Sequence, residues 1–328
     1  MKKLQTIIAC AALVLFAWVI KRIGPASMMA QLMAMRVALP IVLALSVLRM
    51  FLQSVTWSAS LKGENVAVDS PTLIGTRLAS QSMGYLTVLG PVVSEPMKIK
   101  LLGTSSESTV AATLLDTGVY WFTSVLIAIA GIMCLPLTVA HTAAYQWMPA
   151  VLALTVAVLL ITRRNPILAG VVRVFGRRSP SWLERAAKWE ASIRSYRLEQ
   201  PALVARMFWI GMACQVLIAC EVVVVLWSLH LPINFFSVLA IEGVTRALKM
   251  ASGWIPARVG SDEGGAVSAF GVVGLSPMLG LGLALTRRVR DLLWALIGII
   301  WLGWKSRSSS QRHAISLVDP IQLPERGV

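Results

Sequence analysis

Hydrophobic residues occur along this chain in long runs, without the regular polar alternation of surface strands. A membrane-spanning helix needs about 20 mostly apolar residues. Residues 4–20, 38–61 and 204–227 each approach or exceed that length, and residues 117–162 are long enough for two such helices. Residues 232–304 are too long for one helix and are interrupted by charges and glycines. The pattern predicts an all-α polytopic membrane protein with about six to eight transmembrane helices.

Two parts of the chain resemble each other and predict an internal repeat. Thr76-Arg77 is followed by Gly84-Tyr85, and Thr245-Arg246 is followed at the same spacing by Gly253-Trp254. A second glycine, an acidic cluster and a long helix with an acidic residue in its first half come next in both copies. Counting the predicted membrane spans from the N-terminus places the two copies in opposite orientations across the membrane. Inverted repeats with interrupted helices are typical of transporters. The alternative is a chance similarity between two apolar, glycine-rich segments.

Glycines and prolines interrupt both copies and predict two broken or re-entrant segments. Non-helical backbone at membrane depth survives only where it is buried in protein or faces a watery cavity. Broken helix ends present free N–H groups that attract anions such as a lipid phosphate. Two ordinary surface loops are the alternative. The residues expected to break the helices are Gly90, Pro91, Pro256, Gly260, Gly264 and Gly265.

Composition agrees with a membrane protein. Of the 328 residues, 57% are hydrophobic and 14% are charged, against about 25% charged in soluble proteins. This hydrophobicity excludes a disordered chain, and only four cysteines exclude a disulfide scaffold. The net charge of +15 then acts as a topology signal. Nine basic residues between positions 163 and 197 predict a cytoplasmic loop, with both termini also in the cytoplasm.

We expect a single transmembrane domain over residues 1–304 of a multi-pass protein in a cell (inner) membrane. It would contain a first repeat at about 38–135, a cytoplasmic basic loop at 163–203 and a second repeat at about 204–304, and residues 305–328 would form a cytoplasmic tail. The basic loop also carries aromatic residues, which favours an interfacial helix on anionic lipid over a nucleic-acid-binding segment. The sequence does not indicate an oligomeric state.

Ionisable residues inside predicted spans are candidates for function, because inserting each one costs about 2.5–3.5 kcal/mol. Glu242 and Arg246 are four residues apart on one helix face, as are Arg287 and Asp291, so each pair can also be a structural salt bridge. The candidates for lipid binding are Arg49, Glu95, Lys98, Arg246, Arg258, Glu263, Arg287, Arg288 and Arg290. The candidates for charge pairing or gating are Asp116, Glu221, Glu242 and Asp291.

The basic cluster at 287–290 contains three arginines and is followed by a single acid. At least one of these arginines therefore needs another anionic partner. Asp116 or Glu221 from elsewhere in the bundle is one choice, and a lipid phosphate held in bidentate fashion is the other.

Patterns typical of catalysis or metal binding do not occur in the sequence. The three histidines are scattered, the cysteines lie in apolar runs without a C-x-x-C spacing, and no nucleophile elbow, P-loop or dinucleotide fingerprint occurs. We therefore expect no enzyme activity, no cofactor and no metal.

The sequence resembles the lysylphosphatidylglycerol synthase transmembrane-region family, whose members are also described as flippase-like, over roughly residues 5–304. The resemblance is most specific in three motifs. The first is Ile255-Pro256-Ala257-Arg258-Val259-Gly260-Ser261-Asp262-Glu263-Gly264-Gly265, and the second is Gly274-Leu275-Ser276-Pro277. The third is the basic cluster that leads into the last helix. The family's first-repeat motif is matched by Gly90-Pro91 and Glu95, but Ser94 replaces a glycine and Lys98 an arginine.

The resemblance implies a protein that moves lipids or lipid-linked precursors between leaflets. Because only 24 residues follow Trp304, we expect no aminoacyl-transferase domain of the kind fused to well-known members. Some stand-alone members are associated with hopanoid lipid metabolism, and this chain is a candidate for that branch.

Our leading hypothesis is therefore a membrane protein that binds and flips a phospholipid or other amphipathic lipid, with membrane lipids of anionic headgroup as its partners. The alternative is a non-transporting accessory protein of a lipid-synthesis or envelope complex, with lipid-synthesis enzymes as partners. A membrane-embedded transferase is a third reading, weakened by the lack of a catalytic set.

Overall fold

The computed structural model describes residues 33, 35–64, 66–87, 90–103, 106–138, 199–252, 255, 258 and 260–318, which form eight helices and no strand. The all-α prediction is confirmed for this part of the chain. The expected first span, the second half of the apolar stretch that ends at residue 162, the basic loop as far as residue 198, Pro256 and residues 319–328 of the expected tail lie outside the described residues.

The eight helices form two groups with the same order of long, short, short and long. The first group is α3 (Ala38–Gly63), α4 (Ser70–Leu86), α5 (Gly90–Leu102) and α6 (Glu107–Thr138), with 26, 17, 13 and 32 residues. The second is α10 (Pro201–Ser228), α11 (Phe235–Ala251), α12 (Ser261–Val272) and α13 (Pro277–Val318), with 28, 17, 12 and 42 residues. The repeated order extends the sequence repeat to the whole described region.

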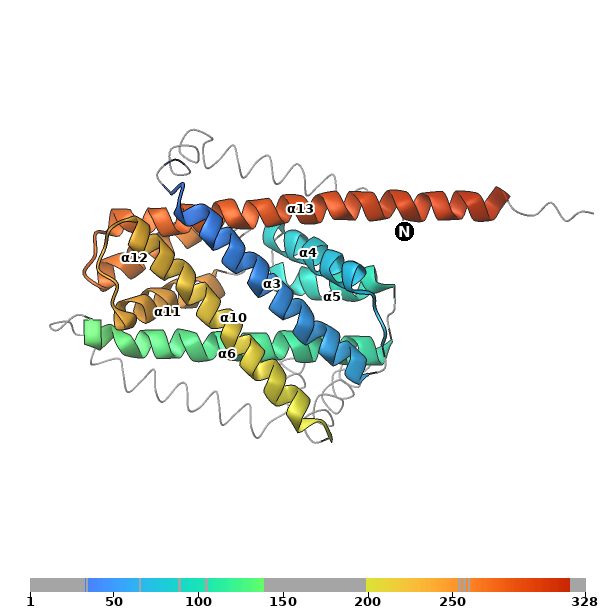
Figure 1. The fold of residues 1–328 in the computed structure, drawn as a ribbon, viewed down its shortest axis with the longest axis horizontal. Helices are drawn as coiled ribbons and strands as arrows, with labels where there is room; N and C mark the ends of the chain where they lie inside the picture. Colours follow the sequence, from blue (N-terminus) through green and yellow to red (C-terminus); the bar gives the residue numbers. More distant parts are fainter. Residues whose placement is uncertain are drawn as a thin grey trace, which may run out of the picture.

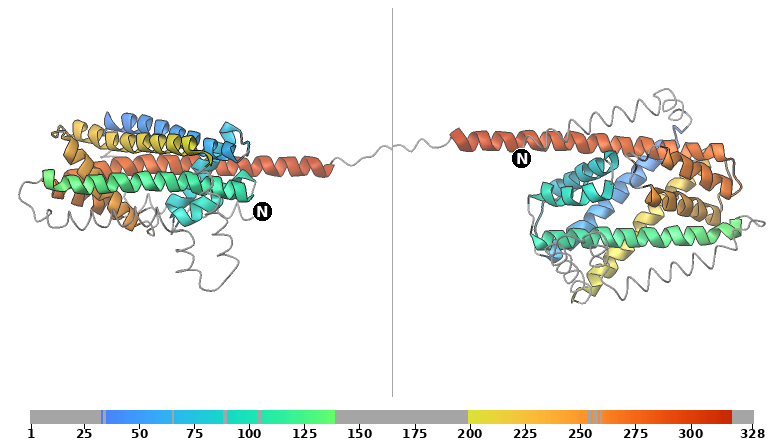
Figure 2. Two further views of the ribbon diagram at one scale, coloured as in Figure 1. Left: turned by 90° about the horizontal axis from the view of Figure 1, so that it is seen from below. Right: turned by 180° about the vertical axis from the view of Figure 1, so that it is seen from behind.

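The two groups run in opposite directions. Figure 1 shows α3 antiparallel to α10 and α6 antiparallel to α13, with the α4–α5 hairpin near one end of the bundle and the α11–α12 hairpin near the other. The packing is reciprocal, because α4 packs against α13 of the other group and α11 packs against α6. Figure 2 shows α3 and α10 side by side on one face, and α13 extending past the other helices. The architecture is therefore an inverted repeat whose halves interlock.

Local sequence signals explain where the short helices begin. Asp69 caps α4 by accepting a hydrogen bond from Thr72 N–H at 3.0 Å, and this bond holds the pKa of the Asp69 carboxyl below its usual value. Asn234 caps α11 in the same way through Phe236 N–H. At α12, Glu263 accepts a hydrogen bond from Gly260 N–H at 2.8 Å, and Gly260 has a φ of 85°, which glycine adopts without strain.

The expected helix breaks occur at some of the predicted glycines but not at others. Gly90 begins α5, with Pro91 in its first turn, and Gly260 immediately precedes α12. Gly264 and Gly265 do not break a helix, since both lie inside α12. A Cβ at Gly264 would meet open space and one at Gly265 would be in ordinary contact with Leu248 of α11, so neither position requires an irregular backbone.

Three helices in the described region, α3, α6 and α10, are long and apolar enough to cross a membrane. Helix α6 starts at Glu107, ten residues before the predicted apolar stretch, and it therefore contains Asp116 as a buried residue. It continues through Pro136 to Thr138. Helix α13 is also long enough, but it carries the basic cluster and Asp291 within its first half.

Glycine allows close contact between the halves where α6 meets α11. A Cβ added at Gly131 of α6 would lie 2.6 Å from the Cα of Gly243 on α11, and the reverse substitution would meet Gly131 equally closely. Since no flexible side chain can yield there, the two backbones would have to move apart.

We expect Gly131→Ala to lower the stability of the protein by about 1–3 kcal/mol through this overpacking. Gly118→Ala is the matched control on the same helix, because its Cβ would meet nothing within 4 Å. Alanine is the better helix former, so the control should unfold at the same or a slightly higher temperature. Thermal unfolding in detergent measures both, and equal midpoints would contradict the close contact.

Candidate functional site

A cavity of about 390 Å³ lies between the two halves, and we call it the central cavity. Side chains of α3, α4, α5, α6, α10, α11, α12 and α13 line it, including residues close to the tips of both hairpins. Eight of the lining residues are cationic and three are acidic. The cations are Arg49, Arg77, Lys98, Arg246, Lys249, Arg258, Arg287 and Arg290, and the acids are Glu242, Asp262 and Asp291.

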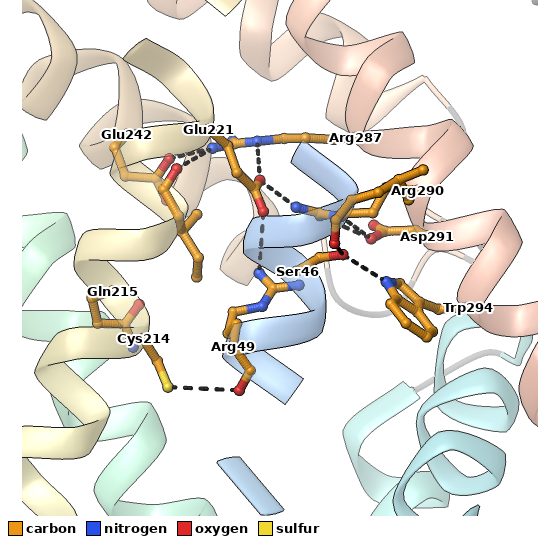
Figure 3. A network of polar contacts seen from close by, with 12 residues as sticks. Ser46, Arg49, Cys214, Gln215, Glu221, Glu242, Arg287, Arg290, Asp291 and Trp294 are labelled. Atoms are coloured by element: carbon orange, nitrogen blue, oxygen red, sulfur yellow. Dashed lines mark hydrogen bonds and ion pairs between the residues drawn. The ribbon is translucent and has the colours of Figure 1, made fainter. Parts of the chain in front are cut away.

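Glu221 of α10 is the hub of the buried charges (Figure 3). Its side chain is 1% exposed and accepts a hydrogen bond from Arg290 of α13. Arg287 Nε lies 3.5 Å from the same carboxylate, and Arg49 of α3 lies 3.9 Å away. One carboxylate thus holds guanidinium groups from both halves of the molecule.

Glu242 of α11 is a second buried acid with two arginine partners. Arg287 donates to it at 2.6 Å, and Arg246, four residues along the same helix, donates to its other oxygen. Arg246 also donates to Gln215 of α10 and, at 3.2 Å, to Ser124 of α6. The expected Glu242–Arg246 pair exists, but it belongs to a network that joins four helices rather than to one helix alone.

Asp291 has different partners from those that its helix spacing suggested. Arg287 points to Glu221 and Glu242, which are buried and need neutralising charge, so it does not pair with Asp291. Instead, Asp291 accepts a hydrogen bond from Arg290 at 2.8 Å and lies 3.6 Å from Arg258.

Arg258 and Arg288 attach the second hairpin to the rest of the protein. Arg258 lies 3.2 Å from Asp262 and its guanidinium is 5.3 Å from the ring centre of Tyr85, at the end of α4 in the other hairpin. Arg288 pairs with Glu263 of α12 at 2.6 Å. The structure thus brings Arg258, Glu263 and Arg288 together near the start of α12.

Asp116 does not reach the arginine cluster of α13. It accepts a hydrogen bond from Thr56 at 2.6 Å and lies 3.3 Å from Arg77 of α4, and both ionic side chains are less than 5% exposed. Arg77 also donates to the backbone carbonyl of Gln53. Sequence reasoning missed Arg77 as a site residue, although it occupies the place in the first repeat that Arg246 occupies in the second.

Glu95 and Lys98, both candidates for lipid binding, form a separate pair on α5. Lys98 donates to both oxygens of Glu95, at 2.9 and 3.1 Å, and Thr117 of α6 donates to Glu95 at 2.7 Å. The ammonium group also lies 5.8 Å from the ring centre of Trp57. Lys98 lines the central cavity, with its charge balanced locally.

Lys249 is a second residue that sequence reasoning missed. It lies one turn after Arg246 on α11, lines the central cavity and is partly exposed. Within the described part of the chain, no carboxylate lies within 4.0 Å of its ammonium group. The spacing from Arg246 was visible in the sequence, but the absence of a partner depends on the packing of other helices.

Several buried polar atoms around the cavity lack hydrogen-bond partners. Among the described residues, these atoms include the hydroxyl oxygen of Tyr85, Nε of Arg77 and Nε of Arg287, and all three residues line the cavity. Most buried polar groups in proteins are paired. Their concentration here indicates a place suited to a polar ligand. The described part of the chain contains no group of three metal-ligating side chains.

The fold and the site together define an all-α polytopic membrane protein with a charge-lined cavity between two inverted halves. The chain belongs to the lysylphosphatidylglycerol synthase TM region family, whose family model matches residues 4–298. This membership confirms the resemblance noted in the sequence and indicates a membrane protein of lipid metabolism or transport. No curated protein and no solved structure matches the chain.

We expect Glu221→Gln to destabilise the protein by about 3–5 kcal/mol, because it leaves buried arginines without their shared counter-charge. Glu199→Gln, at an exposed residue just before α10, is the control and should leave stability unchanged. Thermal unfolding of both purified variants in detergent tests the difference. A Glu221→Gln protein as stable as the control would show that the carboxylate is not the hub of the bundle.

Proposed function

We propose that this protein binds a lipid with an anionic headgroup in the central cavity and translocates it between the leaflets of a cell membrane. The observation that carries the proposal is the excess of cations over acids in a cavity enclosed by membrane helices. Uncompensated charge is expensive to keep away from water, so an anionic ligand stabilises such a site.

The cavity has the size and chemistry for a headgroup rather than for a whole lipid. Its volume, about 390 Å³, is at the lower end of the range of about 300–1,000 Å³ found for small-molecule sites. Arginine guanidinium groups hold phosphate in bidentate fashion. The apolar residues exposed on the outer faces of α3 and α6, such as Phe51 and Phe122, suit contact with acyl chains that stay in the bilayer.

The inverted architecture supports a mechanism of alternating access. In such folds, one half rocks against the other around a site near the middle of the membrane. The polar contacts between the halves are the ones that must change in this motion. They include the bond from Trp294 Nε1 to Ser46 at 2.9 Å, the Arg49–Glu221 pair and the contact of Arg258 with Tyr85. Each is a single bond or a long-range contact, which keeps the cost of rearrangement small.

Three further parts of the proposal concern chemistry and topology. The protein acts without catalysing a covalent reaction and without a cofactor. It resides in a cell (inner) membrane with both termini in the cytoplasm. Under that topology, the α4–α5 hairpin enters from the cytoplasmic side and the α11–α12 hairpin from the opposite side, since each hairpin begins and ends at its own end of the bundle.

We expect a bulky residue in the central cavity to block translocation. Met250→Trp places an indole at a residue that lines the cavity, whereas Met278→Trp makes the same change at a side chain that is 70% exposed. Fluorescently labelled phosphatidylglycerol in proteoliposomes measures movement between leaflets, by quenching from outside. Met250→Trp should slow this movement at least severalfold, and Met278→Trp should match the wild type.

Three outcomes distinguish the readings. Movement at the protein-free rate in the wild-type protein would remove the transport function. Lipid binding by such a protein, dependent on the headgroup, would favour the accessory role in a lipid-synthesis or envelope complex. Equal rates in both tryptophan variants would show that lipid moves by another route than the cavity.

A further inference from the structure

The charges around the central cavity do not balance. Eight lining cations face six carboxylates that lie within 4.0 Å of at least one of them. Close pairs account for six of the cations. These pairs are Arg77–Asp116, Lys98–Glu95, Arg246–Glu242, Arg258–Asp262, Arg287–Glu221 and Arg290–Asp291. Two positive charges, those of Arg49 and Lys249, remain.

Arg49 is held only loosely. Its one acidic neighbour in the described region is Glu221 at 3.9 Å, and this carboxylate already accepts a hydrogen bond from Arg290. The guanidinium of Arg49 donates no hydrogen bond to a described residue, and its side chain is 17% exposed. It is therefore available to an added anion.

Arg49 and Lys249 reach the central cavity from the two halves of the molecule. Arg49 belongs to α3 of the first half and Lys249 to α11 of the second, and both line the cavity. The acid Asp291 lines the same cavity. Asp291 is already paired with Arg290 and Arg258, so it does not neutralise Arg49 or Lys249.

We infer that the cavity contains a subsite for a doubly charged oxyanion, the phosphate monoester of a lipid headgroup, held between Arg49 and Lys249. A phosphate monoester carries about 1.5 to 2 negative charges at pH 7, which matches the two unbalanced cations. A phosphodiester carries a single charge and would leave one cation unmatched. The planar guanidinium can bind two phosphate oxygens and the ammonium group a third.

The inference rests on the proposed lipid-binding function and adds a preference among headgroups. Headgroups with an added cation, such as a choline or an aminoacyl group, are disfavoured because the cavity already has an excess of positive charge. The subsite also joins the two halves, so the bound phosphate replaces repulsion between Arg49 and Lys249 with attraction.

The test is a binding titration of the full chain in detergent with phosphatidic acid, phosphatidylglycerol and phosphatidylcholine of identical acyl chains. Wild-type protein should bind phosphatidic acid about tenfold more tightly than phosphatidylglycerol, and phosphatidylcholine most weakly. Arg49→Gln and Lys249→Gln should each weaken phosphatidic acid binding about tenfold and remove the preference over phosphatidylglycerol. Lys249→Arg should retain it.

Lys62→Gln, at the exposed end of α3, is the matched control and should bind as the wild type does. Competition with inorganic phosphate distinguishes the two sources of the oxyanion. Displacement of phosphatidic acid by millimolar phosphate would show that the phosphate group alone is recognised, and resistance would show that the subsite requires the lipid. Both results retain the subsite, provided that the Arg49 and Lys249 variants are impaired.

Equal affinities for the monoester and the diester, unchanged by either glutamine variant, would overturn the subsite. If phosphatidylglycerol is still translocated in that case, only the subsite fails and the proposed function stands. If the wild-type protein neither binds nor moves any of the three lipids, the proposed function fails and the subsite with it. Unfolding temperatures equal to that of the wild type establish that the variants are folded.

Discussion

Keeping charge away from water is costly unless each charge has a partner, and the carboxylate of Glu221 meets this requirement at the centre of the bundle. It forms ion pairs with Arg290 and Arg287 of α13 and is the nearest acid to Arg49 of α3. Since these groups come from three helices and both halves, the position of each helix depends on the others. The same requirement explains why the arginines of α13 point inward rather than toward lipid.

This arrangement also explains how a cavity with excess positive charge exists within an apolar bundle. The ion pairs compensate most of the cost, and the hairpins bring polar residues to the middle of the molecule without a further complete span. The packing of the halves is reciprocal, because α4 of the first half packs against α13 of the second and α11 of the second packs against α6 of the first. A relative movement of the halves would therefore change the cavity directly.

Much of this fold was predictable because helix periodicity and span length are local properties of the sequence. The Glu242–Arg246 pair follows from spacing alone, and the repeated Thr-Arg and Gly-aromatic motifs indicated two related halves. Partners between helices were not predictable in the same way. Arg287 pairs with Glu221 and Glu242 rather than with Asp291, and Asp116 pairs with Arg77. These pairs form because packing brings together residues that are distant in the sequence. That the positive charges of Arg49 and Lys249 have no balancing carboxylate follows only after all these pairs are assigned.

The most direct test of the account is an experimental structure of the full chain in a lipid nanodisc that contains anionic phospholipid. The account predicts ordered density for a headgroup phosphate in the central cavity, within hydrogen-bond distance of Arg49 and Lys249, with the acyl chains leading out to the bilayer. A cavity without lipid, in which Arg49 and Lys249 are paired with protein carboxylates and ordered lipid lies only along the outer faces of α3, α6 and α10, would contradict it.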